Sequence, residues 1–172
     1  MFSEYFSRQQ LMQFLKWLLY FMLFFFAMLL QSIVLPRLSI AGITLCILPI
    51  CLSCISSREG ADHGTLFGLI AGTFFCLSGA DCGPLYLFVF TLSCAMCGAI
   101  CDQFYTRTIA PTLLLSLLSL TLCEGLVFLF RAYTGAASIS LWFSVLIPEI
   151  LLSAILFPVF YPTVLLISKL GR

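Results

Sequence analysis

Charged residues are scarce in this chain. Its 172 residues include eight Lys and Arg, seven Asp and Glu, and one His, so that charged residues make up 9% of the total. A water-soluble domain carries roughly 25%. Hydrophobic residues make up 62%, and no water-soluble domain of any size is expected. The formal net charge of +1 gives no basic surface, so a nucleic-acid partner is not expected either.

Motifs of catalysis are also missing. The sequence contains no phosphate-binding glycine loop, nucleophile elbow or paired-carboxylate signature. The nine cysteines include Cys51-x-x-Cys54 and the run Cys94, Cys97 and Cys101, spacings that also occur in zinc and iron–sulfur sites. Both groups fall in apolar segments, where spacings of three and four place cysteines on one helix face as small hydrophobes. We therefore expect packing cysteines, no metal or cofactor, and no enzyme.

Six apolar segments account for the remaining sequence, and together they predict a single all-α membrane domain over residues 1–172. The predicted spans are 14–35, 44–56, 64–78, 85–100, 109–130 and 148–167. A full span needs roughly 20 residues. The second and third segments are shorter, and one re-entrant hairpin is the alternative for them. Either choice leaves both termini on the same side of the membrane.

The basic residues predict which side that is. With six spans and cytoplasmic termini, six basic residues lie inside and two lie outside, as the positive-inside rule requires. The inside set is Arg8, Lys16, Arg58, Arg107, Lys169 and Arg172, and the outside set is Arg37 and Arg131. We expect both termini in the cytoplasm.

The last span is expected to begin at Pro148. Proline suits the first position of a helix, and Glu149 would then lie near the positive end of the helix dipole. Residues 141–147 would lie along the outer interface, with Trp142 as an anchor.

Glycines predict where helices pack closely. Gly60, Gly64, Gly68 and Gly72 stand four apart, which keeps them on one slowly drifting helix face. In lipid, faces of small residues let two backbones approach, because apolar burial drives no association there. We expect this face, together with Gly98 in the following predicted span (85–100), to pack against another helix of the chain or of a partner.

Glu124 is the carboxylate that falls well inside a predicted span. An intramembrane acid suggests an ion path or an interhelical hydrogen bond. Its helix neighbours are mainly bulky and apolar, which favours a structural role, and Arg131, two turns further on, is a candidate indirect partner.

The order of these features resembles one family. The segment at 31–36 (QSIVLP) followed by 38–42 (LSIAG), the glycine region from 58–60 (REG) to 78–79 (SG), the 83–86 segment (GPLY), Gly98, the 148–151 segment (PEIL) and the 161–162 pair (YP) recur in this order. They are similar to motifs of the rod shape-determining protein MreD family, and the likeness covers nearly the whole chain.

This resemblance implies a non-enzymatic scaffold in the bacterial cytoplasmic membrane. Its partner would be MreC, within the elongation complex that directs peptidoglycan synthesis in rod-shaped cells. The resemblance also implies a compact six-helix bundle similar to the substrate-binding component of energy-coupling transporters. A small-solute-binding component of that type is therefore the alternative function. A small membrane enzyme is a third possibility, with no residue set to support it.

Overall fold

The computed structural model describes residues 8–38, 46–77, 83–104, 108–135 and 142–170, and these residues form helices and turns without a strand. Residues at the edges of two predicted spans (44, 45 and 78), parts of the family-like motifs, and Arg107 and Arg172 lie outside the described ranges. The helices are α1 (Arg8–Leu29), α2 (Leu48–Glu59), α3 (Ala61–Leu77), α4 (Gly83–Phe104), α5 (Ile109–Tyr133), α6 (Trp142–Ala154) and α7 (Phe157–Leu170). A π-helical turn (Leu30–Val34) and a 3-10 turn (Leu35–Leu38) continue α1.

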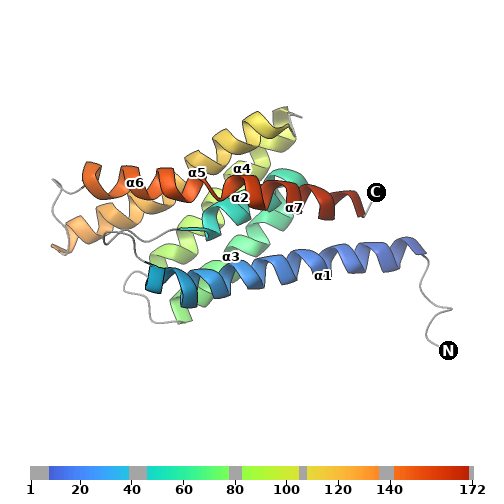
Figure 1. Cartoon of the computed structure of the whole chain (residues 1–172), viewed down its shortest axis with the longest axis horizontal. Helices are drawn as coiled ribbons and strands as arrows, with labels where there is room; N and C mark the ends of the chain where they lie inside the picture. Colours follow the sequence, from blue (N-terminus) through green and yellow to red (C-terminus); the bar gives the residue numbers. More distant parts are fainter. Residues whose placement is uncertain (1–7, 39–45, 78–82, 105–107, 136–141, 171–172) are drawn as a thin grey trace.

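Helix α2 is the centre of the bundle. Every residue from Leu48 to Ser57 is buried, and α2 packs against α1, α3, α4, α5 and α7. Its small Ser and Cys side chains let these neighbours approach from several sides. Figure 1 shows α1 along one long edge of the molecule, α6 and α7 running lengthwise across the middle of the view, and α3, α4 and α5 crossing obliquely. The first turn of α1 and the last turn of α7 lie at the same end.

The lengths of the helices identify an all-α membrane protein. Within the described ranges, three helical stretches are long and apolar enough to cross a membrane: Gln10–Val34, Gly83–Phe104 and Ile109–Tyr133. The pair Ile147–Ala154 and Phe157–Leu170 makes a fourth if it is counted as one bent span. Helix α2 has 12 residues, about 18 Å, and is shorter than a hydrocarbon core of roughly 30 Å. Six complete spans are therefore not confirmed.

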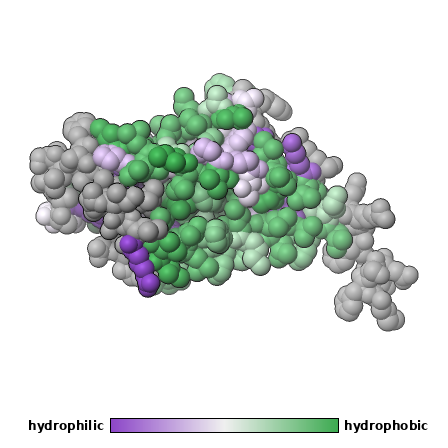
Figure 2. Space-filling view, in the orientation of Figure 1, coloured by the Kyte–Doolittle hydropathy of each residue, from purple (hydrophilic) through white to green (hydrophobic). Residues whose placement is uncertain are grey.

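The outer surface is apolar, as a lipid solvent requires. Phe14, Phe21 and Phe25 on α1 each expose about half or more of their surface, and exposed Leu and Phe side chains continue over α3, α4 and α5. Figure 2 shows apolar residues covering most of the described part of this face, with small hydrophilic patches toward its two ends. These apolar side chains face outward, where a bilayer would surround them.

The last span differs from its prediction. The helix begins at Trp142, not at Pro148, and runs through Pro148 and Glu149 to Ala154. The break falls at Ile155 and Leu156, where α6 and α7 meet at 44°. An internal proline frees one backbone carbonyl, a loss that helices in membranes tolerate because neighbouring groups satisfy it. Pro158, the second residue of α7, has the helix-starting position that had been expected for Pro148.

Candidate functional site

The glycines of α3 lie at the closest helix contacts in the bundle. A Cβ atom added at Gly72 would lie 2.3 Å from the Cα of Leu87, and one added at Gly68 would lie 2.7 Å from the carbonyl oxygen of Phe90. From α4, Gly98 faces α3 in the same way, with an added Cβ 2.4 Å from the Cα of Ala61. Helices α3 and α4 form the most extensive helix pair of the bundle. This face is thus covered within the chain and is not open to a partner.

Gly64 belongs to the same row but faces α2. An added Cβ there would lie 2.2 Å from the Ser56 hydroxyl oxygen, and that hydroxyl donates a hydrogen bond to the Cys94 carbonyl oxygen of α4. On the other side of α2, the Ser53 hydroxyl donates to the Ser116 hydroxyl of α5 at 2.8 Å. Short side chains and hydroxyl groups therefore connect α2 to α4 and α5.

Gly60 does not share the α3 face, in contrast to the prediction from spacing. It lies between α2 and α3 with φ +94°, a backbone conformation that L side chains rarely adopt. Its N–H donates to the Ser56 carbonyl oxygen at 3.0 Å, and its own carbonyl accepts from the Gly64 N–H at 3.1 Å. The Asp102 carboxylate accepts the next N–H, that of Ala61, at 3.1 Å. Gly60 therefore makes the turn that brings α3 back along α2.

The cysteines mostly fill the interior. Seven of the eight in the described ranges are buried and all eight are free thiols, while Cys76 is exposed and Cys82 lies outside those ranges. Cys123 of α5 contacts the Ser93 hydroxyl of α4 at 3.5 Å, and the Cys97 thiol points to the Leu115 carbonyl oxygen. Among the described residues, no group of three or more His, Cys, Asp and Glu could hold a metal ion. Here the thiols act as small packing groups.

Glu124 lies beside the beginning of α2. The Cys46 thiol is within hydrogen-bonding reach of the Glu124 carboxyl group. The Arg131 guanidinium interacts electrostatically with the same carboxyl group, as the position of Arg131 two turns away had suggested. The carboxyl group of Glu149, a residue that is 9% exposed, lies close enough to Cys46 to interact with its thiol electrostatically. The sequence did not reveal this proximity, because Glu149 had been expected at a helix end near the outer interface.

Two side chains cap the first N–H groups before α2. The Ser153 hydroxyl of α6 accepts the Cys46 N–H at 3.0 Å, and the Gln31 side-chain oxygen accepts the Ile47 N–H at 2.7 Å. The first N–H groups of a helix have no partner within the helix, and in a membrane they need one. The start of α2 is thus a buried polar region built from three other segments.

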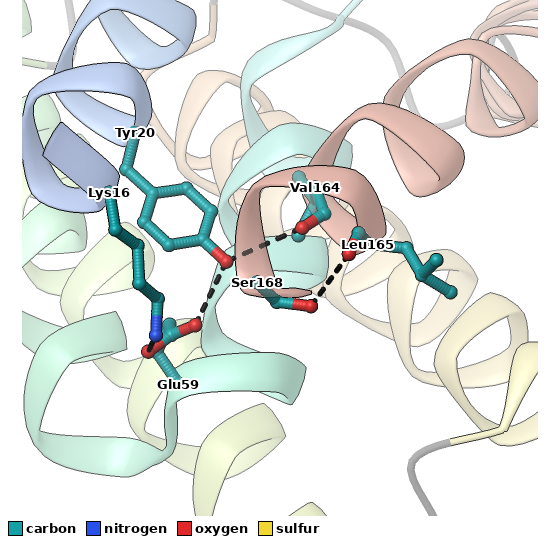
Figure 3. A network of polar contacts seen from close by, with 6 residues as sticks. All are labelled: Lys16, Tyr20, Glu59, Val164, Leu165 and Ser168. Atoms are coloured by element: carbon teal, nitrogen blue, oxygen red, sulfur yellow. Dashed lines mark hydrogen bonds and ion pairs between the residues drawn. The ribbon is translucent and has the colours of Figure 1, made fainter. Parts of the chain in front are cut away.

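A second buried polar site connects α1, α2 and α7 (Figure 3). The Lys16 ammonium lies 2.6 Å from one Glu59 carboxylate oxygen, and the two side chains are 15% and 10% exposed. The Tyr20 hydroxyl is 2.9 Å from the other carboxylate oxygen and 3.4 Å from the Val164 carbonyl oxygen. We name Lys16, Tyr20 and Glu59 the clasp cluster. Sequence reasoning used Lys16 only for orientation, although an ionisable residue inside an apolar span is itself a signal of a buried partner.

Aromatic contacts surround the clasp cluster. The Trp17 ring stacks on His63 of α3, with ring centres 4.5 Å apart. The Arg58 guanidinium donates a hydrogen bond to the Tyr161 hydroxyl of α7 and lies 5.2 Å from the centre of that ring. Cations near aromatic faces gain up to about 2 kcal/mol where water is excluded. Basic and aromatic side chains thus join four helices at this end of the bundle.

Two hollows lie against α5, and both are apolar. One, of about 40 Å³, is lined by Ile50, Leu113, Ser116, Leu117, Ala154 and Phe157. The other, of about 320 Å³, is lined by Ile100, Cys101, Phe104, Pro111, Leu114 and Leu115. Neither has a charged residue in its lining, so neither has the few convergent polar groups of a typical site for a polar solute.

Comparison with protein-family models, with curated proteins and with solved structures finds no match for this chain.

Proposed function

We propose that this chain is a non-enzymatic scaffold of the bacterial cytoplasmic membrane, of the MreD type. In this role it docks MreC and connects it to the enzymes that extend peptidoglycan in rod-shaped cells. The proposal rests on the order of motifs along the chain, which resembles that family, and on the all-α membrane architecture.

The observation that best favours a scaffold is the distribution of apolar surface. The glycine face is covered inside the chain, and the two apolar hollows suit no polar solute. The outer faces of α1 and α3 instead present large apolar side chains, including Phe21, Phe25 and Phe74. Such faces are open to lipid and to the membrane helices of other proteins. The partner surface of a scaffold therefore belongs on these outer faces and not on the glycine row.

A solute-binding component of an energy-coupling transporter is the second candidate, and one observation favours it. The carboxyl groups of the half-buried Glu124 and the buried Glu149 lie near the start of α2, a short helix whose first N–H groups point into a polar region. Transporters often place such interrupted helices at their binding sites. Ser153 and Gln31 already accept the Cys46 and Ile47 N–H groups, which agrees better with a structural role.

Co-purification tests the scaffold directly. The tagged full chain is extracted in mild detergent from membranes that also contain MreC and an unrelated single-span protein as control. The scaffold predicts that MreC, and not the control protein, elutes with the chain. Replacing the exposed Phe21 and Phe25 with Ala should weaken this association. Replacing the buried Phe90 with Ala should lower the stability of the chain but leave the binding of MreC to the folded chain unchanged. Equal recovery of MreC and the control protein would overturn the proposal.

A further inference from the structure

Helix α1 is attached to the bundle along one side. Tyr20, Phe24, Ala27 and Met28 are buried against its neighbours, while the opposite face is exposed. Its partners in the described part of the chain are chiefly α7 and α2. In a bilayer, burying an apolar side chain against a helix gains little over burying it in lipid. Polar contacts therefore contribute much of what holds α1 in place.

Those polar contacts gather at two points. Near the middle of α1, Lys16 and Tyr20 occupy both carboxylate oxygens of Glu59, the last residue of α2. Beyond the C-terminal end of α1, Gln31 binds the Ile47 N–H inside a π-helical turn that a 3-10 turn follows. Departures from α-helical hydrogen bonding often mark hinges. The middle of α1 thus has a clasp, and its C-terminal end continues into an irregular, tethered turn.

We propose that α1 is a strap which the clasp cluster holds closed. When the clasp opens, α1 swings away from α7 about the irregular turn at 30–38, and the remaining bundle keeps its fold. Opening uncovers the side of α7 that contains Val164 and the inner face of α1 with Tyr20 and Phe24. This motion is a property beyond the scaffold role itself.

The chain contains its own reporters for this motion. Trp17 stacks on His63 only while the strap is closed, so opening moves its ring from the imidazole into lipid. Replacing Trp142 with Phe leaves Trp17 as the single tryptophan. The buried thiols of α2, α4 and α5 report whether the rest of the bundle stays folded, because unfolding would expose them.

The full chain carrying Trp142→Phe is reconstituted in liposomes that contain brominated phospholipid, which quenches tryptophan on contact. Lys16→Met and Glu59→Gln should each raise the open population on the order of tenfold or more, because each breaks a largely buried ion pair. Quenching of Trp17 should rise, while a membrane-permeant maleimide reacts with the buried thiols no faster than before. Lys169→Met removes an exposed charge at the same end and should change neither signal.

A double variant distinguishes two reasons why the strap would open in the single variants. One is the loss of the attraction between Lys16 and Glu59, and the other is the cost of leaving one charge without its partner. Lys16→Met with Glu59→Leu leaves no buried charge, so a penalty alone predicts a strap that closes again as in the parent chain. The clasp predicts that quenching stays high, because apolar side chains do not hold α1 in lipid. Unchanged quenching in both single variants, recovery in the double variant, or faster thiol reaction in step with quenching would each overturn the proposal.

Discussion

Adding one methyl group at Gly72 provides a sharp test of the packing described for α3 and α4. The new Cβ would lie 2.3 Å from the Cα of Leu87, with its backbone N at 3.0 Å and its Cβ at 3.1 Å. Two of these atoms belong to the backbone and cannot rotate away. Gly72→Ala therefore forces the two helices apart. Gly125 on α5 is the matched control, because a Cβ there meets nothing within 4 Å.

The two substitutions share one contribution to the free energy of unfolding and differ in a second. Replacing glycine by alanine inside a helix stabilises it by roughly 0.5–1 kcal/mol, and this gain applies at both positions. Overpacking costs about 1–3 kcal/mol and applies only at Gly72. The difference between the two variants isolates the packing term. We expect Gly125→Ala to be more stable than Gly72→Ala by about 1–3 kcal/mol, roughly 5- to 150-fold in the folding equilibrium.

The assay is reversible unfolding of the full chain in mixed anionic and nonionic detergent micelles. The unfolded fraction is followed by the reaction of buried thiols with a maleimide, since seven of the described cysteines are buried in the folded protein. Gly72→Leu should be worse than Gly72→Ala, because its side chain also enters the contact. Equal stability of Gly72→Ala and Gly125→Ala would refute the inferred closeness of α3 and α4.

Three further predictions concern the turn, the buried acid and the orientation. Gly60→Ala should destabilise the chain on the order of 1–3 kcal/mol in the same unfolding assay, because φ +94° is strained for any side chain; wild-type stability would count against this turn geometry. Glu124→Gln should cost less than about 1 kcal/mol, because the amide still forms hydrogen bonds; loss of folding would show that the charge itself is required. In a variant without native cysteines, a cysteine at Thr134 should react with an impermeant thiol reagent outside intact cells, and one at Ser168 should not; the reverse pattern would invert the orientation.

The sequence predicted features that depend on local periodicity. Gly64, Gly68 and Gly72 share a face because they lie in one helix, and helical spacing decides that without tertiary information. Gly60 shares their spacing but not their role, because spacing does not tell a helix from the turn before it. The apolar character of the segments likewise indicated an all-α membrane protein, whereas α2 is shorter than a span although its segment had been marked as one.

Features that depend on distant contacts were not predictable. Lys16 and Glu59 are 43 residues apart, and their ion pair exists because α1 packs beside the end of α2. The break expected at Pro148 was wrong for a related reason. A proline weakens a helix locally, but whether the helix bends there depends on which neighbours satisfy the freed carbonyl. The buried position of Glu149 follows from the same continuous helix.

The width of cells depleted of this protein tests the proposed function most directly. In a rod-shaped host, an adaptor of wall synthesis that is lost leaves the synthetic enzymes active but without spatial guidance. We predict that depleted cells swell and become round before growth stops, and that the wild-type gene restores their shape. Depleted cells that keep a normal width, and that regain growth when a nutrient is supplied, would contradict the scaffold and favour the solute-binding alternative.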